Sequence, residues 1–186
     1  PLPVKTGETY GWETPEKSIG RIHSFHGNIR VMVRAYTYIL SMGAAGLTQA
    51  SETAVLNANY VMQKLKGIYP PAYDRPCMHE CVLSARRQKE QGASAMDIAK
   101  GLLDCGFHPP TVYFPLIVKE AMMIEPTETE SKETLDMFIG AMRELAEKAE
   151  KDPQWLHEAP RTTPIGRADE VAAVRNPVLR WKGETV

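Results

Sequence analysis

The chain has 186 residues, of which 43% are hydrophobic and 24% are charged, and its 22 basic residues balance 23 acidic ones. This length suits one domain with appended segments, and the balanced charge gives no bias towards nucleic acids or anionic membrane surfaces. No apolar run approaches the roughly 20 residues that a membrane-spanning helix needs, and the first residues lack the layout of a signal peptide. We therefore expect a cytoplasmic protein with no nucleic-acid or membrane partner.

The first part of the chain divides into a lead-in and two helical stretches. Residues 1–26 are polar and contain several prolines, so we expect an extended lead-in. Residues 27–46 form a long connecting helix that is apolar nearly all round, which predicts burial on most sides. Thr48 is the expected N-cap of a second helix, which Gly67 ends. Residues 47–152 are predicted to form a small domain and residues 153–186 a tail.

The small domain mixes strand and helix patterns. Alternation predicts a strand over residues 77–84, and short aromatic or apolar runs predict strands at 111–116 and 120–126. Ser94 and Asp97 predict a capping-box-like start for a helix that ends at Gly106. An apolar stripe predicts a helix over 131–150. The predicted fold class is α/β with an α+β-like small domain, in which a small antiparallel or mixed sheet carries helices on one face.

The tail is expected to be extended from Pro153 onward, because prolines recur through it. A short helix near residues 169–174 is the expected interruption.

A metal site is the first chemical possibility, since Cys77, Cys81, Cys105 and His108 are four soft ligands with His79 in reserve. In a strand, Cys77 and Cys81 would lie roughly 13 Å apart, whereas zinc ligands lie within roughly 4 Å of each other. We therefore predict no metal site and interpret the cysteines as thiols of the core. An odd number of cysteines also argues against a disulfide framework.

Two further clusters have a catalytic and a structural interpretation. Cys105 with His108 could form a nucleophilic pair, but a cysteine at the end of a helix lacks the helix N-terminus that lowers a thiol pKa. Glu125, Glu128 and Glu130 could serve acid-base chemistry. Acidic residues around a helix start are also favoured by the helix dipole, and this interpretation covers all of them except Glu125.

The turn "SFHGN" at residues 24–28 feeds the first helix and offers an anion site. Free N–H groups at a helix N-terminus bind anions, and Arg30 and Arg34 add positive charge to one face. The alternative is a helix start capped by Asn28, with both arginines paired to surface carboxylates.

Several long segments carry a family resemblance, from Lys17 to about Leu145. They are "KSIGRIHSFHGNIRVMVRAYTYILSMGAAGL", "ASETAVLNANYVMQKLKG", "MHECVLSA", "LLDCGFHPPTVYFPL" and "AMMIEPTETESKETLDMFI". In this order they resemble the C-terminal part of the glycine dehydrogenase (decarboxylating) family, the P-proteins of the glycine cleavage system, in the bacterial subunit 2 form. The resemblance implies the small domain of a fold-type I enzyme that uses pyridoxal phosphate, releases carbon dioxide from glycine and passes the aminomethyl group to the lipoyl arm of the H-protein.

The resemblance also implies what the chain lacks and which residues approach the site. In the family the cofactor lysine follows a histidine and precedes a glycine-rich run, and no lysine of this chain has that context. We therefore predict that the chain alone is inactive and contains no catalytic residue. His26, Gly27 and Asn28 are expected near the cofactor phosphate. His108, Thr111 and Tyr113 are expected at the substrate entrance, and "GFHPPTVYFPL" is otherwise a turn into a strand.

The partners implied by the resemblance are the remainder of subunit 2, subunit 1 of the P-protein, the lipoylated H-protein and glycine, within an oligomeric enzyme. The alternative is a free-standing binding or assembly module of the same fold without the chemistry. An apolar exposed surface favours the portion of an enzyme, because an independent module would have polar residues there. The apolar helix after Asn28 predicts such a surface.

Overall fold

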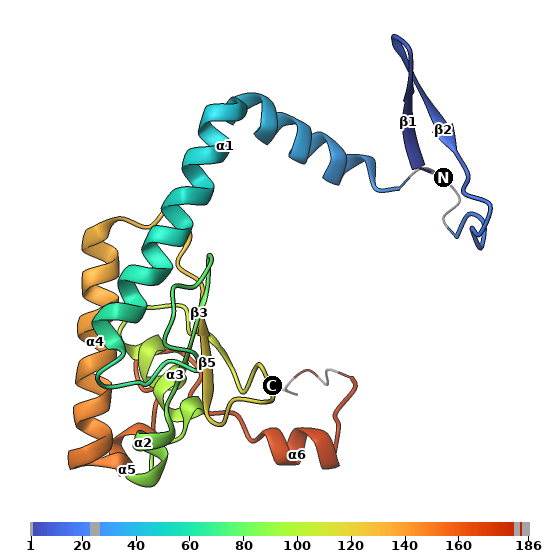
Figure 1. Cartoon of the computed structure of the whole chain (residues 1–186). Coiled ribbons are helices and arrows are strands. Elements are labelled where there is room, and N and C mark those ends of the chain that lie inside the picture. The colour runs from blue at the N-terminus through green and yellow to red at the C-terminus, as the bar shows by residue number, and fades with distance from the viewer. Residues whose placement is uncertain (1, 23–26, 181–182, 184–186) are drawn as a thin grey trace. The chain divides into compact units, whose positions relative to one another are not determined.

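A computed structural model describes residues 2–22, 27–180 and 183 of the chain (Figure 1). The chain forms two compact units, Pro1–Leu47 and Thr48–Val186, which we call the first unit and the second unit. Within the described residues, no helix combines the length and the apolar character that crossing a bilayer requires.

The first unit begins with a β-hairpin, which lies within the residues expected to form an extended lead-in. Strands β1 (Leu2–Thr6) and β2 (Thr9–Glu13) pair antiparallel, and the register places Thr6 opposite Thr9 across a two-residue turn. Gly7 in that turn has a φ of 64°, a backbone conformation that glycine adopts without a steric penalty.

Helix α1 (Ile29–Leu65) begins in the first unit and ends in the second. Its backbone leaves helical geometry at Gly43, where φ is 61° and ψ is −178°. The prediction of a new helix capped by Thr48 is therefore wrong, because helical residues continue through Thr48 and the interruption falls five positions earlier. A glycine permits it there, since a residue with a Cβ disfavours positive φ.

The N-terminal part of α1 exposes the apolar side chains that the sequence predicts to be buried. Between 46% and 64% of the surface of each is accessible, so the prediction of burial is wrong for this chain. The exposed residues are Ile29, Val31, Met32, Val33, Tyr36, Tyr38, Ile39 and Leu40. The sequence also predicts an exposed apolar surface along this helix, and this prediction is confirmed.

The second unit contains a three-stranded antiparallel sheet in the order β3-β5-β4. Its strands are β3 (Cys81–Ser84), β4 (Thr111–Val112) and β5 (Ala121–Ile124). All three lie within predicted strands but are shorter. The strand predicted at 111–116 ends early because Tyr113 has a φ of 59° and Pro115 has no N–H to donate to a neighbouring strand.

Among its described residues, the second unit has five further helices. They are α2 (Arg86–Glu90), α3 (Ala95–Asp104), α4 (Lys132–Lys151), α5 (Pro153–His157) and α6 (Glu170–Arg175). The capping box of Ser94 and Asp97 at α3 is confirmed, and so are α4 and the short helix in the tail. The tail does not extend from Pro153, because Asp152 caps α5 and Pro153 occupies its first turn.

The core of the second unit lies between the sheet and helices α1, α3, α4 and α5. Figure 1 shows the C-terminal half of α1 running beside α4, and the Tyr60 hydroxyl joins the two by donating to Asp136 Oδ1 at 2.5 Å. The fully buried Tyr69, just after α1, donates its hydroxyl to the Met142 carbonyl at 2.9 Å. Burial raises the pKa of Tyr69, so this donor keeps its proton. The largest fully buried side chains include Met62, Leu65, Leu83, Ile98, Leu102, Met122, Met142, Leu145 and Leu156.

Candidate functional site

The start of α1 forms around Asn28, as the structural interpretation of "SFHGN" predicts. Asn28 Oδ1 accepts a hydrogen bond from the Arg30 N–H at 3.2 Å, and the Asn28 carbonyl accepts from Val31 and Met32. His26 lies outside the described residues. Gly27 has a φ of 117°, and a Cβ there would meet Met32 Cε at 3.0 Å. Neither Arg30 nor Arg34 makes an ion pair with a described residue, so their charge is available.

The residues expected at the substrate entrance lie in the second unit, whereas Gly27 and Asn28 belong to the first. His108 is exposed after α3, Thr111 opens β4, and Tyr113 follows that strand with 42% of its surface exposed. The structure places Thr111 and Tyr113 in one short stretch, and Thr111 pairs with Met123 of β5. No hydrogen bond or ring contact of the described residues joins the side chain of His108 to Tyr113.

The loop between Tyr113 and Glu120 is held at both ends by backbone hydrogen bonds. The Tyr113 N–H donates to the Ala121 carbonyl, and the Ala85 N–H donates to the Glu120 carbonyl, both at 2.9 Å. Glu120 Oε2 also accepts from the Ala95 N–H at 2.7 Å. These bonds hold Tyr113 and Glu120 at φ values of 59° and 51°, which side chains rarely adopt. The loop between them exposes Phe114, Leu116 and Ile117.

The cysteines are not arranged for metal binding or nucleophilic catalysis. Strand β3 begins at Cys81, so the distance argument that assumed a strand from residue 77 rested on a wrong premise. Within the part of the chain that the structure describes, no three His, Cys, Asp or Glu side chains gather to hold a metal ion. Burial raises the pKa of the Cys81 thiol to about 12. Partial burial also raises the pKa of Cys105, although Lys148 opposes it, so neither thiol is an activated nucleophile.

The acidic segment before α4 has the structural arrangement expected of a helix start. Ser131 is the N-cap of α4, with its hydroxyl accepting from the Thr134 N–H at 3.1 Å, and Glu133 lies in the first turn. Glu125 directly follows β5, and its carboxylate is 3.7 Å from Nε2 of His79. Both of these side chains are more than half exposed, so the pair contributes little to stability.

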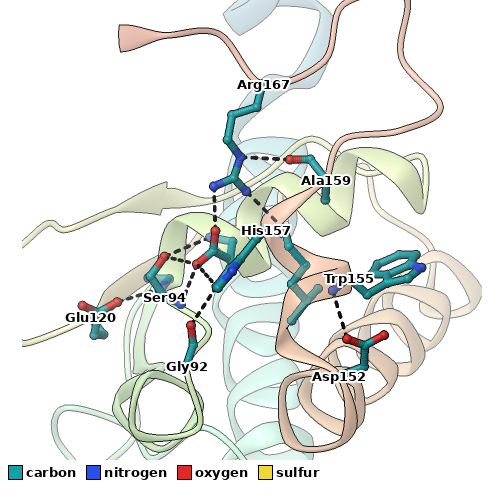
Figure 2. Close-up of polar contacts among 11 residues, drawn as sticks. Gly92, Ser94, Glu120, Asp152, Trp155, His157, Ala159 and Arg167 are labelled. Carbon is teal, nitrogen blue, oxygen red and sulfur yellow. Dashed lines mark hydrogen bonds and ion pairs between the residues drawn. The ribbon is translucent and has the colours of Figure 1, made fainter. Parts of the chain in front are cut away.

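A buried carboxylate network that sequence reasoning missed attaches the tail to α3. Asp97, with 8% of its side chain exposed, accepts from the Ser94 N–H at 2.8 Å and pairs with Arg167 Nη1 at 2.7 Å. Figure 2 shows Arg167 reaching towards the Ala159 carbonyl, to which its Nε donates at 3.1 Å, and His157 beside the Gly92 carbonyl at 2.9 Å. The predicted capping box accounts for Ser94, but 70 residues separate Asp97 from Arg167 and no local pattern joins them.

A second carboxylate attaches the tail at the other end of α3. Asp104 Oδ1 accepts from the Arg161 N–H at 2.7 Å, from the Thr162 N–H at 2.8 Å and from the Thr162 hydroxyl at 2.9 Å. Residues 157–167 are therefore fixed along α3 at two points. This arrangement supports the architecture of the second unit.

Acid should weaken this attachment. Burial alone would raise the pKa of Asp97, but hydrogen bonds from Ser94 and the Arg167 charge outweigh it and lower the pKa. A carboxyl with a lowered pKa in the folded state contributes stability above its ordinary value of about 3.9, and that stability is lost as the pH falls through the folded pKa. We expect the free energy of unfolding to decrease on acidification below about pH 5, and to decrease less in Asp97→Asn. Urea titrations across this pH range measure both slopes, and parallel slopes would contradict the assignment to Asp97.

Comparison with known proteins identifies the family. The family model "Glycine dehydrogenase, C-terminal domain" matches residues 50–160. The chain belongs to this family. Its resemblance to P-proteins, stated from the sequence, is thereby confirmed.

Two similar relatives are bacterial proteins. A "probable glycine dehydrogenase (decarboxylating) subunit 2" of Caldanaerobacter subterraneus subsp. tengcongensis is 58% identical over 164 residues, which cover 88% of this chain and 34% of that protein. The protein of the same name from Bacillus velezensis is 55% identical over 186 residues, covering 98% of this chain and 38% of that protein. The chain therefore spans little more than a third of the length of these relatives.

Proposed function

We propose that the chain supplies the C-terminal portion of the glycine decarboxylase of the glycine cleavage system. In this function the complete enzyme releases the carboxyl group of glycine as carbon dioxide and passes the aminomethyl group to the lipoyl arm of the H-protein. The observation that carries the proposal is the 55% identity to a subunit 2 across 98% of this chain. Identity this high over so much of the chain is consistent with a shared role in the same enzyme.

The exposed apolar surface of α1 supports a role within a larger assembly. Soluble monomers rarely expose extended apolar patches, and such a patch marks an interaction surface. In the proposed enzyme this surface contacts the remainder of subunit 2 or subunit 1, in an oligomeric complex. A free-standing module would leave this helix without a partner to cover it. The exposure of side chains such as Val33, Tyr36 and Leu40 therefore favours the alternative in which the chain is a portion of an enzyme.

Pyridoxal phosphate is the cofactor proposed for the complete enzyme, but the residues of this chain do not fit it by themselves. No lysine here has the sequence context of the family's cofactor lysine. At the start of α1, the N–H groups of Arg30, Val31 and Met32 already donate to the side chain or carbonyl of Asn28. We therefore assign the cofactor lysine and the main cofactor contacts to the part of the enzyme that this chain does not span.

The residues of this chain are proposed to border the active site of the complete enzyme rather than to perform its chemistry. Gly27 and Asn28, with His26, are proposed to approach the cofactor phosphate, where the unpaired charge of Arg30 and Arg34 would favour an anion. His108, Thr111 and Tyr113 are proposed to line the substrate entrance. The anchored loop after Tyr113 supports this role, because an entrance residue must be held in place.

The experiment compares a full-length subunit 2 that contains these residues with the 186-residue chain alone. With subunit 1, H-protein and pyridoxal phosphate, the full-length protein is expected to release labelled carbon dioxide from carboxyl-labelled glycine, and the chain alone is not. A matched control deletes residues 1–186 of this sequence from the full-length protein and should abolish turnover. Full turnover in the deleted protein, or none with the complete one, would overturn the proposal.

A further inference from the structure

The second unit contains a pocket. Its volume is about 340 Å³, and three segments distant in sequence line it: Pro70–Tyr73, Ser84 with Arg86, and Ile117–Lys119. This volume is in the range of small-molecule sites. His108, Thr111, Tyr113, Gly27 and Asn28 are absent from its lining.

The walls of the pocket are fixed by hydrogen bonds. The segment after Tyr69 runs along β3, with the Ser84 N–H donating to the Pro70 carbonyl and the Ala72 N–H donating to the Val82 carbonyl, both at 2.9 Å. The buried Ser84 hydroxyl donates to the Lys119 carbonyl at 2.7 Å and accepts from the Arg86 N–H at 3.3 Å. The Ser84 side chain therefore links the backbone of Lys119 to the backbone of Arg86, and these two residues supply the pocket's cations.

The charge of the pocket lining is positive. Among the described residues that line it, Arg86 and Lys119 are the only cations and none carries a carboxylate. Neither cation makes an ion pair with a described residue. The two nearest acidic residues in sequence are engaged elsewhere. Asp74 pairs with Lys66 at 3.4 Å, and Glu120 Oε2 accepts from the Ala95 N–H at 2.7 Å. An anionic group in the pocket would therefore meet two unneutralised cations.

The rest of the lining is mainly apolar. Pro70, Pro71, Ile117 and Val118 present aliphatic surface, and Tyr73 adds an aromatic ring. Such a wall stabilises the apolar part of a ligand by removing it from water. A small inorganic anion would leave this wall unused. A carboxylate attached to a short apolar stem uses both the wall and the cations.

We propose that this pocket binds a carboxylate that carries a short apolar stem, with Arg86 and Lys119 at the carboxylate and Tyr73 and Ile117 along the stem. Such a ligand is either a free carboxylic acid or the C-terminus of a peptide that ends in an apolar residue. Binding at this pocket can be tested on this chain without turnover.

The probes are hexanoate and the peptide acetyl-Gly-Leu with a free C-terminus, titrated into the ¹⁵N-labelled 186-residue chain. Hexanamide and acetyl-Gly-Leu-amide are the matched neutral controls. We expect hexanoate to shift the amide signals of Ser84, Arg86 and Lys119 with a dissociation constant of about 1 mM or tighter. A stronger response to the peptide acid than to hexanoate identifies a peptide terminus as the source, and the reverse order identifies a free acid.

The variant Arg86→Gln/Lys119→Gln should weaken binding by about tenfold or more, because hydrogen bonds to charged groups are the stronger kind. Both side chains are exposed, so the fold should persist, which the ligand-free spectrum checks. Lys89→Gln on the same helix removes a cation outside the pocket lining and should leave binding unchanged. Equal binding of hexanamide, unchanged binding in the double variant, or no pocket shifts with either acid would overturn the proposal.

Discussion

Replacing Asp97 by alanine is expected to lower the free energy of unfolding of the second unit by roughly 2 to 4 kcal/mol. Two losses combine in this estimate. The first is the carboxylate half of the capping box of α3, in which Asp97 Oδ2 accepts from the Ser94 N–H at 2.8 Å and from the Ser94 hydroxyl at 2.5 Å. The second is the ion pair with Arg167, because the guanidinium charge would remain after the Asp97 carboxylate is removed.

The expected loss of stability is smaller than the cost of breaking a fully buried ion pair, because 36% of the Arg167 side chain is exposed to solvent. Water can therefore solvate part of the guanidinium after the carboxylate is removed. The guanidinium also retains its bonds to the carbonyls of Ala159 and Leu156, so it can stay in place. The tail should nevertheless loosen, since one of its two attachments to α3 is lost.

Urea unfolding of Asp97→Ala, Arg167→Gln and the double variant measures the coupling between the two residues. We expect a coupling free energy of roughly 1 kcal/mol or more, with faster tryptic cleavage in the tail of each variant. Asp169→Ala is the matched control, because it removes a capping carboxylate from α6, a helix with no buried residue. It should change global stability by less than about 0.5 kcal/mol. If Asp97→Ala costs no more than Ser94→Ala and the coupling is zero, the ion pair does not stabilise the fold.

The elements predicted best from the sequence are those whose signals are local. Helix α4 follows from an apolar stripe that includes Leu135 and Met142, and α3 follows from its capping box. Helix α5 also has a local signal, Asp152 followed by Pro153, which the density of prolines in the tail concealed. The strand predicted at 111–116 was too long, because residues that favour strands give no sign of the positive φ at Tyr113.

The features that the sequence could not predict depend on residues far apart along the chain. Asp97 and Arg167 meet only after the tail folds back on α3, and the pocket needs three segments that span residues 70 to 119. The burial of α1 was mispredicted for a different reason. A helix that is apolar all round predicts a covering surface, but it does not show whether that surface belongs to the same chain.

Gly101→Ala is expected to destabilise the second unit although alanine is the better helix former. A Cβ at Gly101 of α3 would lie 2.5 Å from Leu145 Cδ2 of α4 and 3.3 Å from Leu156 Cδ2 of α5. Both leucines are buried, with 1% or less of their surface exposed. Overpacking a core typically costs about 1 to 3 kcal/mol, and the gain in helix propensity offsets at most about 1 kcal/mol. We therefore expect a net loss of roughly 1 to 2 kcal/mol.

Gly140 of α4 is the matched control, because a Cβ there meets no heavy atom within 4 Å. Gly140→Ala should gain helix propensity without a steric penalty and raise the free energy of unfolding by about 0.5 to 1 kcal/mol. Opposite signs for the same chemical change would show that close contact of α3 with α4 and α5 requires the glycine at position 101. A stabilising Gly101→Ala would mean that Leu145 can rotate away from the new methyl group at little cost, and the requirement would not hold.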